Sequence, residues 1–190
     1  MYLHPPRNGG KSIEDIIFNE KPALGSSCHK TITDFIHKGV DINSYYKFMF
    51  CRNPWDRLVS IYYWWITISP VSPDESEENT AISESFNKWV SGEFLKKDMY
   101  DGHKIPQIKW ITDEENDKII KLDYLGRFEN FEKDFNKLCE NLDMDLKLPH
   151  HNATRHDHYS VYYNEESIEI VTKIFREDIE YFSYKFEEKA

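Results

Sequence analysis

The chain has 190 residues, of which 39% are hydrophobic and 15% aromatic, and its formal net charge is -10. The length is typical of one domain, and the content of large apolar side chains excludes a disordered chain. The acidic balance argues against a nucleic-acid-binding protein, which needs a basic face, so any anionic ligand must be held by a local cluster of cations.

The N-terminal part of the chain is expected to begin with a unit of strand, turn and helix. Residues 1–4 form a short apolar strand candidate that ends at two prolines. The spacing of apolar residues then predicts a helix over 12–18. A further helix is predicted from about residue 27 to residue 37, with Ser26 or Ser27 as its cap.

A second unit of this kind begins at residues 45–51, whose aromatic side chains predict a buried strand. A helix is expected immediately afterwards, because Asn53 can cap it and Pro54 suits the first helical position, where a backbone N–H has no partner. Two such units in one short chain favour a parallel sheet covered by helices. We therefore expect an α/β fold, a single domain of residues 1–190 with a central parallel sheet.

The remaining elements are predicted from composition and periodicity. The acidic stretch 69–85 is expected to be an exposed loop, with a helix at about 86–95 after it. Residues 108–112 and 118–128 have the composition of two strands joined by a turn. Two more helices are expected, one from about residue 130 and a last one capped by Asn164.

The cysteines and apolar runs indicate the environment of the protein. Cys28, Cys51 and Cys139 are widely spaced and odd in number, which fits neither a disulfide framework nor a zinc site, so reduced thiols are expected. The longest mostly apolar run, 58–68, is too short to cross a bilayer, and no signal-peptide pattern follows Met1. These observations predict a cytoplasmic protein without a membrane span.

The stretch PPRNGGKS at residues 5–12 ends in Gly-Lys-Ser, like the phosphate-binding loop of NTPases. That loop needs a glycine where this chain has Pro5, and two successive prolines cannot copy its wide turn. What remains is a strand, a glycine turn and a helix whose N–H groups attract an anion. The alternative is an ordinary glycine turn with a capping serine.

The second predicted strand is followed by Arg52, at the edge of the sheet where open α/β sheets bind ligands. Ser60 lies two helical turns after Asn53 and returns to the same side of its helix, so Arg52 and Ser60 are candidates for binding one phosphate together. Taken singly, a surface salt bridge for the arginine and a helix-packing hydroxyl for the serine are the alternatives.

Four segments, in order and spanning almost the whole chain, resemble the PAPS-dependent sulfotransferases. HPPRNGGKSI resembles their 5′-phosphosulfate loop, and FMFCRNPWDRLVSIYY is similar to their 3′-phosphate motif. GRFENFEKDFNKLCENL resembles their G-R-F-E-N segment, and LPHHNATRHDHYSVYYNEESIEIVTKIFREDIEYFSYKF resembles their C-terminal end. The resemblance is to the carbohydrate and glycosaminoglycan enzymes of this family.

The resemblance implies transfer of a sulfuryl group from 3′-phosphoadenosine 5′-phosphosulfate (PAPS) to a hydroxyl, which leaves PAP and requires no metal. It places Arg7, where the family usually has lysine, beside the oxygen that bridges sulfate and phosphate. Guanidinium stays charged and cannot give up a proton as lysine can, so either transfer is slower or Lys11 supplies a second cation. The resemblance implies that the 5′-phosphate is bound by Asn8, Gly9, Gly10, Lys11 and Ser12. It implies that the 3′-phosphate is bound by Arg52 and Ser60. Thr154 and Arg155 are the implied contacts from a loop over the nucleotide.

A sugar hydroxyl must lose a proton as it attacks, and histidine is suited to accept it near neutral pH. His29 matches a position where the family tends to carry a histidine, and it is the first candidate for the base. His103 is the second candidate, or else an acceptor contact together with Gln107. A plain helix-surface histidine is the alternative for His29.

The histidine-rich segment HHNATRHDH at 150–158 does not have the spacing of a zinc site, so no metal is expected there. The acceptor is expected to be a neutral or weakly charged glycan or glycan precursor, because the acidic chain disfavours a long polyanion. Two other functions stay open, a nucleotide kinase that uses the Gly-Lys-Ser loop and a nucleotide-binding module without turnover. The oligomeric state is not indicated by the sequence.

Overall fold

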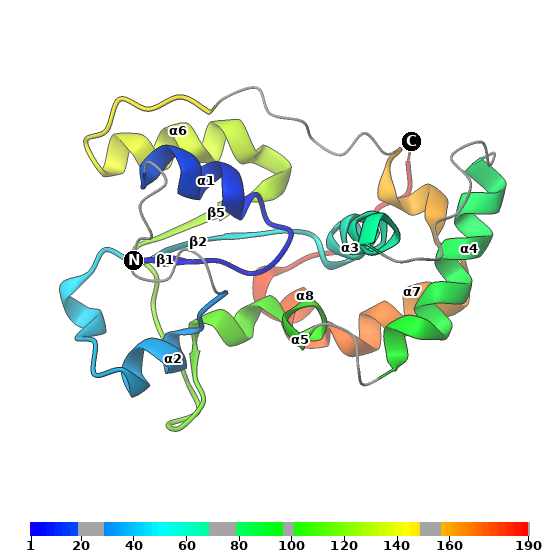
Figure 1. Cartoon of the computed structure of the whole chain (residues 1–190), viewed down its shortest axis with the longest axis horizontal. Coiled ribbons are helices and arrows are strands. Elements are labelled where there is room, and N and C mark those ends of the chain that lie inside the picture. The colour runs from blue at the N-terminus through cyan, green and yellow to red at the C-terminus, as the bar shows by residue number, and fades with distance from the viewer. Residues whose placement is uncertain (19–28, 69–78, 97–100, 149–156, 190) are drawn as a thin grey trace. The chain divides into compact units, whose positions relative to one another are not determined.

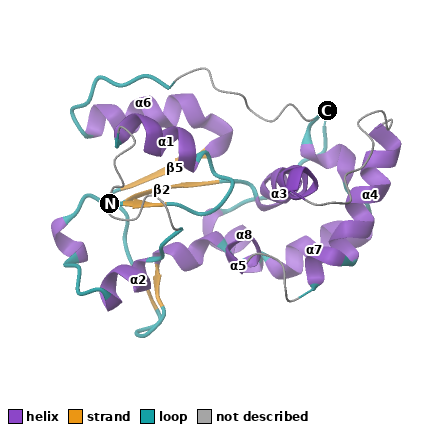
Figure 2. Cartoon of the chain, viewed as in Figure 1, coloured by secondary structure: helices purple, strands orange, loops and turns teal. Residues whose placement is uncertain are grey.

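The computed structural model describes residues 1–18, 29–68, 79–96, 101–148 and 157–189 (Figure 1). Contacts within the chain define two compact units, one of Met1–Arg52 with Gln107–His151 and the other of Asn53–Pro106 with Asn152–Ala190. All described strands belong to the first unit, and the described part of the second unit is built from helices and connecting segments (Figure 2).

The first unit contains a sheet of three parallel strands in the order β1 (Tyr2–Leu3), β2 (Phe48–Cys51) and β5 (Tyr124–Arg127). Tyr2 of β1 and Tyr124 of β5 both lie opposite Phe48 of β2, which fixes the register. The carboxyl ends of all three strands therefore lie at one edge of the sheet. The expected α/β class and the parallel sheet are confirmed.

One face of the sheet is covered by α1 (Gly10–Ile17) and α6 (Phe131–Asn141) (Figure 1). Successive side chains of a strand point to opposite faces, so every second strand residue faces these helices. Leu3, Met49 and Cys51 point to the opposite face and are fully buried as well, which explains the unbroken apolar run of β2. The core on the helix-covered face is formed by Tyr2, Phe48 and Phe50 of the strands, Ile13 of α1, and Phe135, Leu138 and Cys139 of α6.

Residues 108–128 of the first unit differ from the sequence prediction in two places. Residues 108–112, predicted as a strand, belong mainly to a 3-10 helix, Gln107–Ile111, because three residues per turn bring the buried Ile108 and Ile111 to one side. The predicted strand 118–128 is two strands, β5 and β4 (Lys118–Ile119), and β4 pairs with β3 (Thr112–Asp113) in a separate antiparallel hairpin.

Residues 29–37 of the predicted helix 27–37 are described, and the helix begins later than predicted. Helix α2 spans Ile32–His37, and Thr31 caps it in a capping box with Asp34. The expected caps Ser26 and Ser27 lie outside the described residues, as does Cys28. Cys51 and Cys139 are buried free thiols.

The second unit begins with α3 (Pro54–Ile68), whose start is as predicted: the Oδ1 of Asn53 accepts the N–H of Trp55 at 3.0 Å. Asn164 likewise caps α7 (Glu165–Ile174). The predicted last helix is, however, two helices, because the buried Phe175 leaves the helical backbone region between α7 and α8 (Arg176–Phe182).

The acidic stretch 69–85 was expected to be a loop, but α4 (Asn79–Ser91) begins within it and ends before residue 95. Residues 69–78 lie outside the described residues. The unit also contains α5 (Asp101–Lys104). No helix in the described ranges is both long enough and apolar enough to span a membrane. The other 3-10 helices among the described residues are Ile42–Ser44, Glu93–Leu95, Phe128–Asn130 and Tyr159–Tyr162.

Candidate active site

The carboxyl edge of the parallel sheet carries the residues that the sequence analysis singled out in the first unit. The loop at residues 4–9 follows β1 and leads into α1, Arg52 follows β2, and Phe128 follows β5. Ligands of open α/β sheets bind at this edge, where loops diverge from the strand ends. The fold therefore brings two of the predicted phosphate-binding segments together.

The loop before α1 has a backbone suited to an anion. Arg7 and Gly9 both adopt positive φ angles, 69° and 75°, and flank Asn8. Alternation of right-handed and left-handed residues is the backbone pattern of anion-binding nests, in which successive N–H groups point to one side. Gly9 is the N-cap of α1 without a side-chain cap, and the first turn of the helix has no acidic residue. The N-terminal N–H groups and the positive end of the helix dipole are thus available to an anion.

Both glycines of the loop are required by close packing. A Cβ atom on Gly9 would lie 2.6 Å from the Phe131 ring, and one on Gly10 would lie 1.5 Å from Nε2 of His4. Lys11 and Ser12 occupy the first turn of α1, with Lys11 exposed. The glycines therefore allow the loop to approach its aromatic neighbours, in addition to any approach to a ligand.

Asn8 is fully buried, and its side chain anchors the loop to the sheet. Its Nδ2 donates to the carbonyl of Phe50 at 2.8 Å and to Oε1 of Gln107 at 2.6 Å. A phosphate contact by Asn8 would therefore use its backbone N–H. Gln107, expected at an acceptor, is also fully buried and bonds to the backbone of Arg52. Its contact with an acceptor stays a prediction.

Two arginines lie close together beside the loop. The Arg52 side chain donates from Nη1 to the carbonyl of Arg7 at 2.9 Å, and its guanidinium centre lies 4.1 Å from the centroid of the Phe128 ring. Burial lowers the pKa of the Arg7 guanidinium, and the positive charge of Arg52 lowers this pKa further. Both groups remain cationic near neutral pH, so a bound anion would relieve their mutual repulsion.

Two histidines of the first unit, His4 and His29, lie together beside the start of this loop. Their rings are 4.6 Å apart, and Nδ1 of His29 lies 3.0 Å from the carbonyl oxygen of His4. A carbonyl can only accept, so Nδ1 of His29 carries the proton and the neutral ring has its lone pair on Nε2. His29 is exposed, and its backbone oxygen accepts the Nε1–H of Trp110 at 3.1 Å. The geometry is compatible with a proton acceptor beside the loop.

The other predicted site residues belong to the second unit or lie outside the described residues. Ser60 is buried on α3, and the ring of His103 on α5 stacks on Trp64 with 4.4 Å between centroids. Thr154 and Arg155 fall in the range 149–156, which is not described. The pairing of Ser60 with Arg52 and the roles of His103, Thr154 and Arg155 stay predictions.

Three residues of this site were missed by sequence reasoning. Phe128 supports the Arg52 guanidinium, and the ring of His4 is held by Glu14, whose Oε1 lies 3.1 Å from Nδ1. Phe128 lies within the G-R-F-E-N segment that the sequence analysis singled out, so the sequence did contain a signal for this residue. The contact between His4 and Glu14 follows from the packing of α1 on the sheet and has no local sequence signal.

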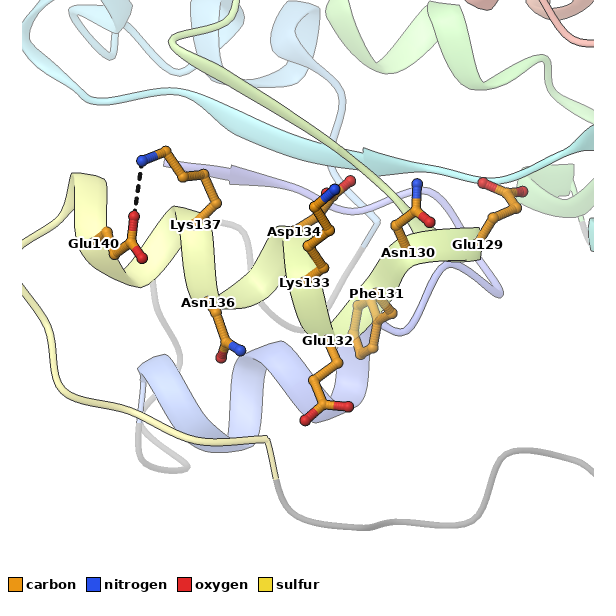
Figure 3. Close-up of a pocket in the computed structure, with 9 residues that line it drawn as sticks. All are labelled: Glu129, Asn130, Phe131, Glu132, Lys133, Asp134, Asn136, Lys137 and Glu140. Atoms are coloured by element: carbon orange, nitrogen blue, oxygen red, sulfur yellow. Dashed lines mark hydrogen bonds and ion pairs between the residues drawn. The ribbon is translucent and has the colours of Figure 1, made fainter.

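A hollow of about 730 Å³ lies along α6 and the preceding turn (Figure 3). It contains four carboxylates and two lysines, one of which, Lys137, pairs with Glu140 at 2.8 Å. This acidic balance makes the hollow unsuited to a ligand that carries several phosphates. Its lining residues are Glu129, Asn130, Phe131, Glu132, Lys133, Asp134, Asn136, Lys137 and Glu140.

The parallel sheet, the glycine-rich loop and helix α1 together define a P-loop-like α/β fold. The chain belongs to the sulfotransferase family, whose family model matches residues 19–185. The members of this family are transferases that move a sulfuryl group. Searches of curated proteins and of solved structures each found no significant match. The loop at residues 4–12 precedes the matched range, so its interpretation depends on its own geometry.

Proposed function

We propose that this sulfotransferase takes its sulfuryl group from PAPS and transfers it to a hydroxyl of a carbohydrate-like acceptor, with PAP as the second product. The observation that carries the proposal is the loop of Arg7, Asn8 and Gly9, which has positive φ angles at Arg7 and Gly9 and leads into a helix without a side-chain cap, with Arg52 bonded to the same loop. A dianionic 5′-phosphosulfate and a separate 3′-phosphate are ligands that such a loop and arginine would bind.

In this proposal the residues of the loop bind the donor and stabilise the leaving group. The backbone N–H groups of residues 8–12 and the Ser12 hydroxyl bind the 5′-phosphate, and Arg7 lies beside the bridging oxygen. Arg52 and Ser60 bind the 3′-phosphate, and Thr154 and Arg155 contribute from the C-terminal part of the chain. Transition-state charge develops on the leaving oxygen, where Arg7 and the helix dipole stabilise it.

The proposed transfer forms one bond and breaks one bond at sulfur. The acceptor oxygen attacks sulfur, the bond from sulfur to the bridging oxygen breaks, and the electron pair of that bond stays on the phosphate of PAP. Nε2 of His29 accepts the hydroxyl proton, because its Nδ1 is held by the His4 carbonyl. His103 is the alternative base or, with Gln107, an acceptor contact.

Arg7 stands where the resemblance implies lysine, and its chemistry is correspondingly limited. Guanidinium can neutralise the leaving oxygen and donate hydrogen bonds, but it keeps its protons. Lys11, exposed on the first turn of α1, supplies a second cation near the start of the helix. Acceptors of low charge suit the net charge of -10 better than long polyanions do.

Two measurements test the proposal against its alternatives. Calorimetric titration with PAP, and separately with ATP and Mg²⁺, distinguishes a sulfotransferase from a nucleotide kinase, because preferred binding of ATP would reject our proposal. Incubation with radiolabelled PAPS and a panel of neutral and charged glycans then measures transfer. Binding of PAP without transfer to any acceptor would favour a nucleotide-binding module.

A further inference from the structure

Gln107 is a polar residue without any exposed surface, at the first position of a 3-10 helix in the first unit. A buried amide is costly unless its oxygen and nitrogen are both hydrogen-bonded. Both groups are satisfied here: Oε1 accepts the backbone N–H of Arg52 at 2.9 Å and Nδ2 of Asn8 at 2.6 Å, and Nε2 donates to the Arg52 carbonyl at 2.8 Å. All three bonds go to residues of the candidate site.

The two bonds to Arg52 have the form of a strand ladder. Strand β2 ends at Cys51, and the Gln107 amide then binds both the N–H and the C=O of the next residue, as a neighbouring strand would. This pairing holds the backbone of Arg52 at the strand end. It consequently sets the direction in which the guanidinium leaves the sheet, toward the Arg7 carbonyl and the Phe128 ring.

The third bond links this strand end to the glycine-rich loop. Nδ2 of Asn8 donates both to Gln107 and to the Phe50 carbonyl, and two acceptors on one atom fix the orientation of the Asn8 amide. The oxygen of Gln107 is thus shared by the loop after β1 and the residue after β2. Both segments are far from Gln107 in the sequence: Asn8 precedes it by 99 residues and Arg52 by 55.

We propose that Gln107 is a positioning residue that holds the 5′-phosphate loop and Arg52 in the relative arrangement that the donor requires. This inference rests on the proposed function for the identity of the ligand, but the mechanical linkage is independent of it. Gln107 has no direct contact with the reacting atoms in this role. It acts through Asn8 and through the Arg52 backbone.

Hydrogen exchange on the ligand-free protein tests the linkage. Gln107→Met keeps a similar volume but removes all three bonds, so we expect amide exchange in peptides covering residues 4–13 and 48–53 to become about 10-fold faster or more. Thr33→Val is the matched control, because Thr33 is also buried in the first unit and its hydroxyl bonds to Thr112 and Glu114. The control should leave exchange in both peptides unchanged.

The proposal is rejected if Gln107→Met leaves exchange in both peptides as in the wild type, or raises it evenly along the chain as a general loss of stability would. If Gln107→Met does not fold, Gln107→Glu replaces it, since this variant keeps an acceptor for Asn8 and for the Arg52 N–H and loses the donor to the Arg52 carbonyl. Faster exchange in residues 48–53 is then expected, and unchanged exchange there overturns the linkage.

Calorimetric titration with PAP extends the test to the ligand. Gln107→Met should raise the Kd for PAP about 10-fold or more, with Thr33→Val unchanged, because the phosphate-binding groups are no longer held in place. With PAPS, KM should rise more than kcat falls. Wild-type protein that fails to bind PAP would reject the proposed function, while the exchange experiment would still decide the linkage. An unchanged Kd in Gln107→Met would overturn the positioning role.

Discussion

Replacing Gly10 by alanine tests how closely the start of α1 packs against His4. The backbone of Gly10 does not have a positive φ, so alanine is compatible with its conformation. The added Cβ would, however, lie 1.5 Å from Nε2 of His4 and within 2.0 Å of both adjacent ring carbons. The imidazole must therefore move as a whole, since no small shift of a flexible end relieves this overlap.

The cost can be worked from the contacts that hold His4 in place. His4 is 8% exposed, and its ring stacks on Tyr2 with 5.4 Å between centroids and bonds to Glu14 at 3.1 Å. Overpacking of this kind costs about 1–3 kcal/mol, and the lost hydrogen bond adds about 1 kcal/mol. We expect Gly10→Ala to lower the free energy of unfolding by about 2–4 kcal/mol.

A double-mutant cycle measured by urea unfolding distinguishes this clash from a general effect of the substitution. In the background of His4→Ala, Gly10→Ala should cost less than about 1 kcal/mol, because the ring is gone and alanine is the better helix former. Gly39→Ala is the control: Gly39 has φ +70° and nothing within 4 Å of an added Cβ, so its cost of about 1 kcal/mol should be the same in both backgrounds. Equal costs of Gly10→Ala with and without His4 would refute the described packing.

Three further changes test the site and the charge interactions. Arg52→Ala should raise the Kd for PAP about 10-fold to 100-fold in calorimetric titration, since a charge-assisted contact is lost; an unchanged Kd would reject the 3′-phosphate role. His29→Ala should leave the Kd for PAP intact and lower kcat by about 10²-fold or more, and an unaffected kcat would transfer the role of base to His103. The pKa of the Asp123 carboxyl is lowered, chiefly because the backbone N–H of Lys47 donates to it. The ionised carboxylate therefore stabilises the fold at pH values above the ordinary pKa of aspartate. This stabilisation is lost as the pH falls through the lower pKa of the folded protein. The difference in unfolding free energy between wild type and Asp123→Asn should accordingly be constant near neutral pH and shrink below about pH 4; growth of the difference in acid would contradict this sign.

The features predicted correctly from the sequence have local signals. Asn53 and Asn164 cap α3 and α7 because a short polar side chain followed by an apolar period specifies a helix start within a few residues. The strand at 108–112 was predicted wrongly because its local signal is ambiguous. A short apolar run with Ile108 and Ile111 three residues apart fits either a buried strand or a 3-10 turn, and local sequence does not decide between them.

The contacts that assemble the candidate site could not be predicted in this way. The Asn8 amide reaches a glutamine 99 positions later, and the guanidinium of Arg52 reaches a carbonyl 45 positions earlier. These bonds depend on the order of the strands and on where the 3-10 helix begins. The residue types of the loop were visible in the sequence, but the left-handed conformation of Arg7, a non-glycine residue, was not.

The peptide between Arg7 and Asn8 sharpens the expected effect of Arg52→Ala. In a trans peptide the C=O and N–H point in opposite directions, so the Arg7 carbonyl that accepts from Arg52 turns the Asn8 N–H away from that guanidinium. A phosphate on the Asn8 N–H and a phosphate on Arg52 must therefore be two different groups of the ligand. Arg52→Ala should weaken binding of PAP, which carries both phosphates, far more than binding of AMP, which lacks the 3′-phosphate. Equal losses for the two nucleotides would mean that Arg52 acts only by bracing the loop.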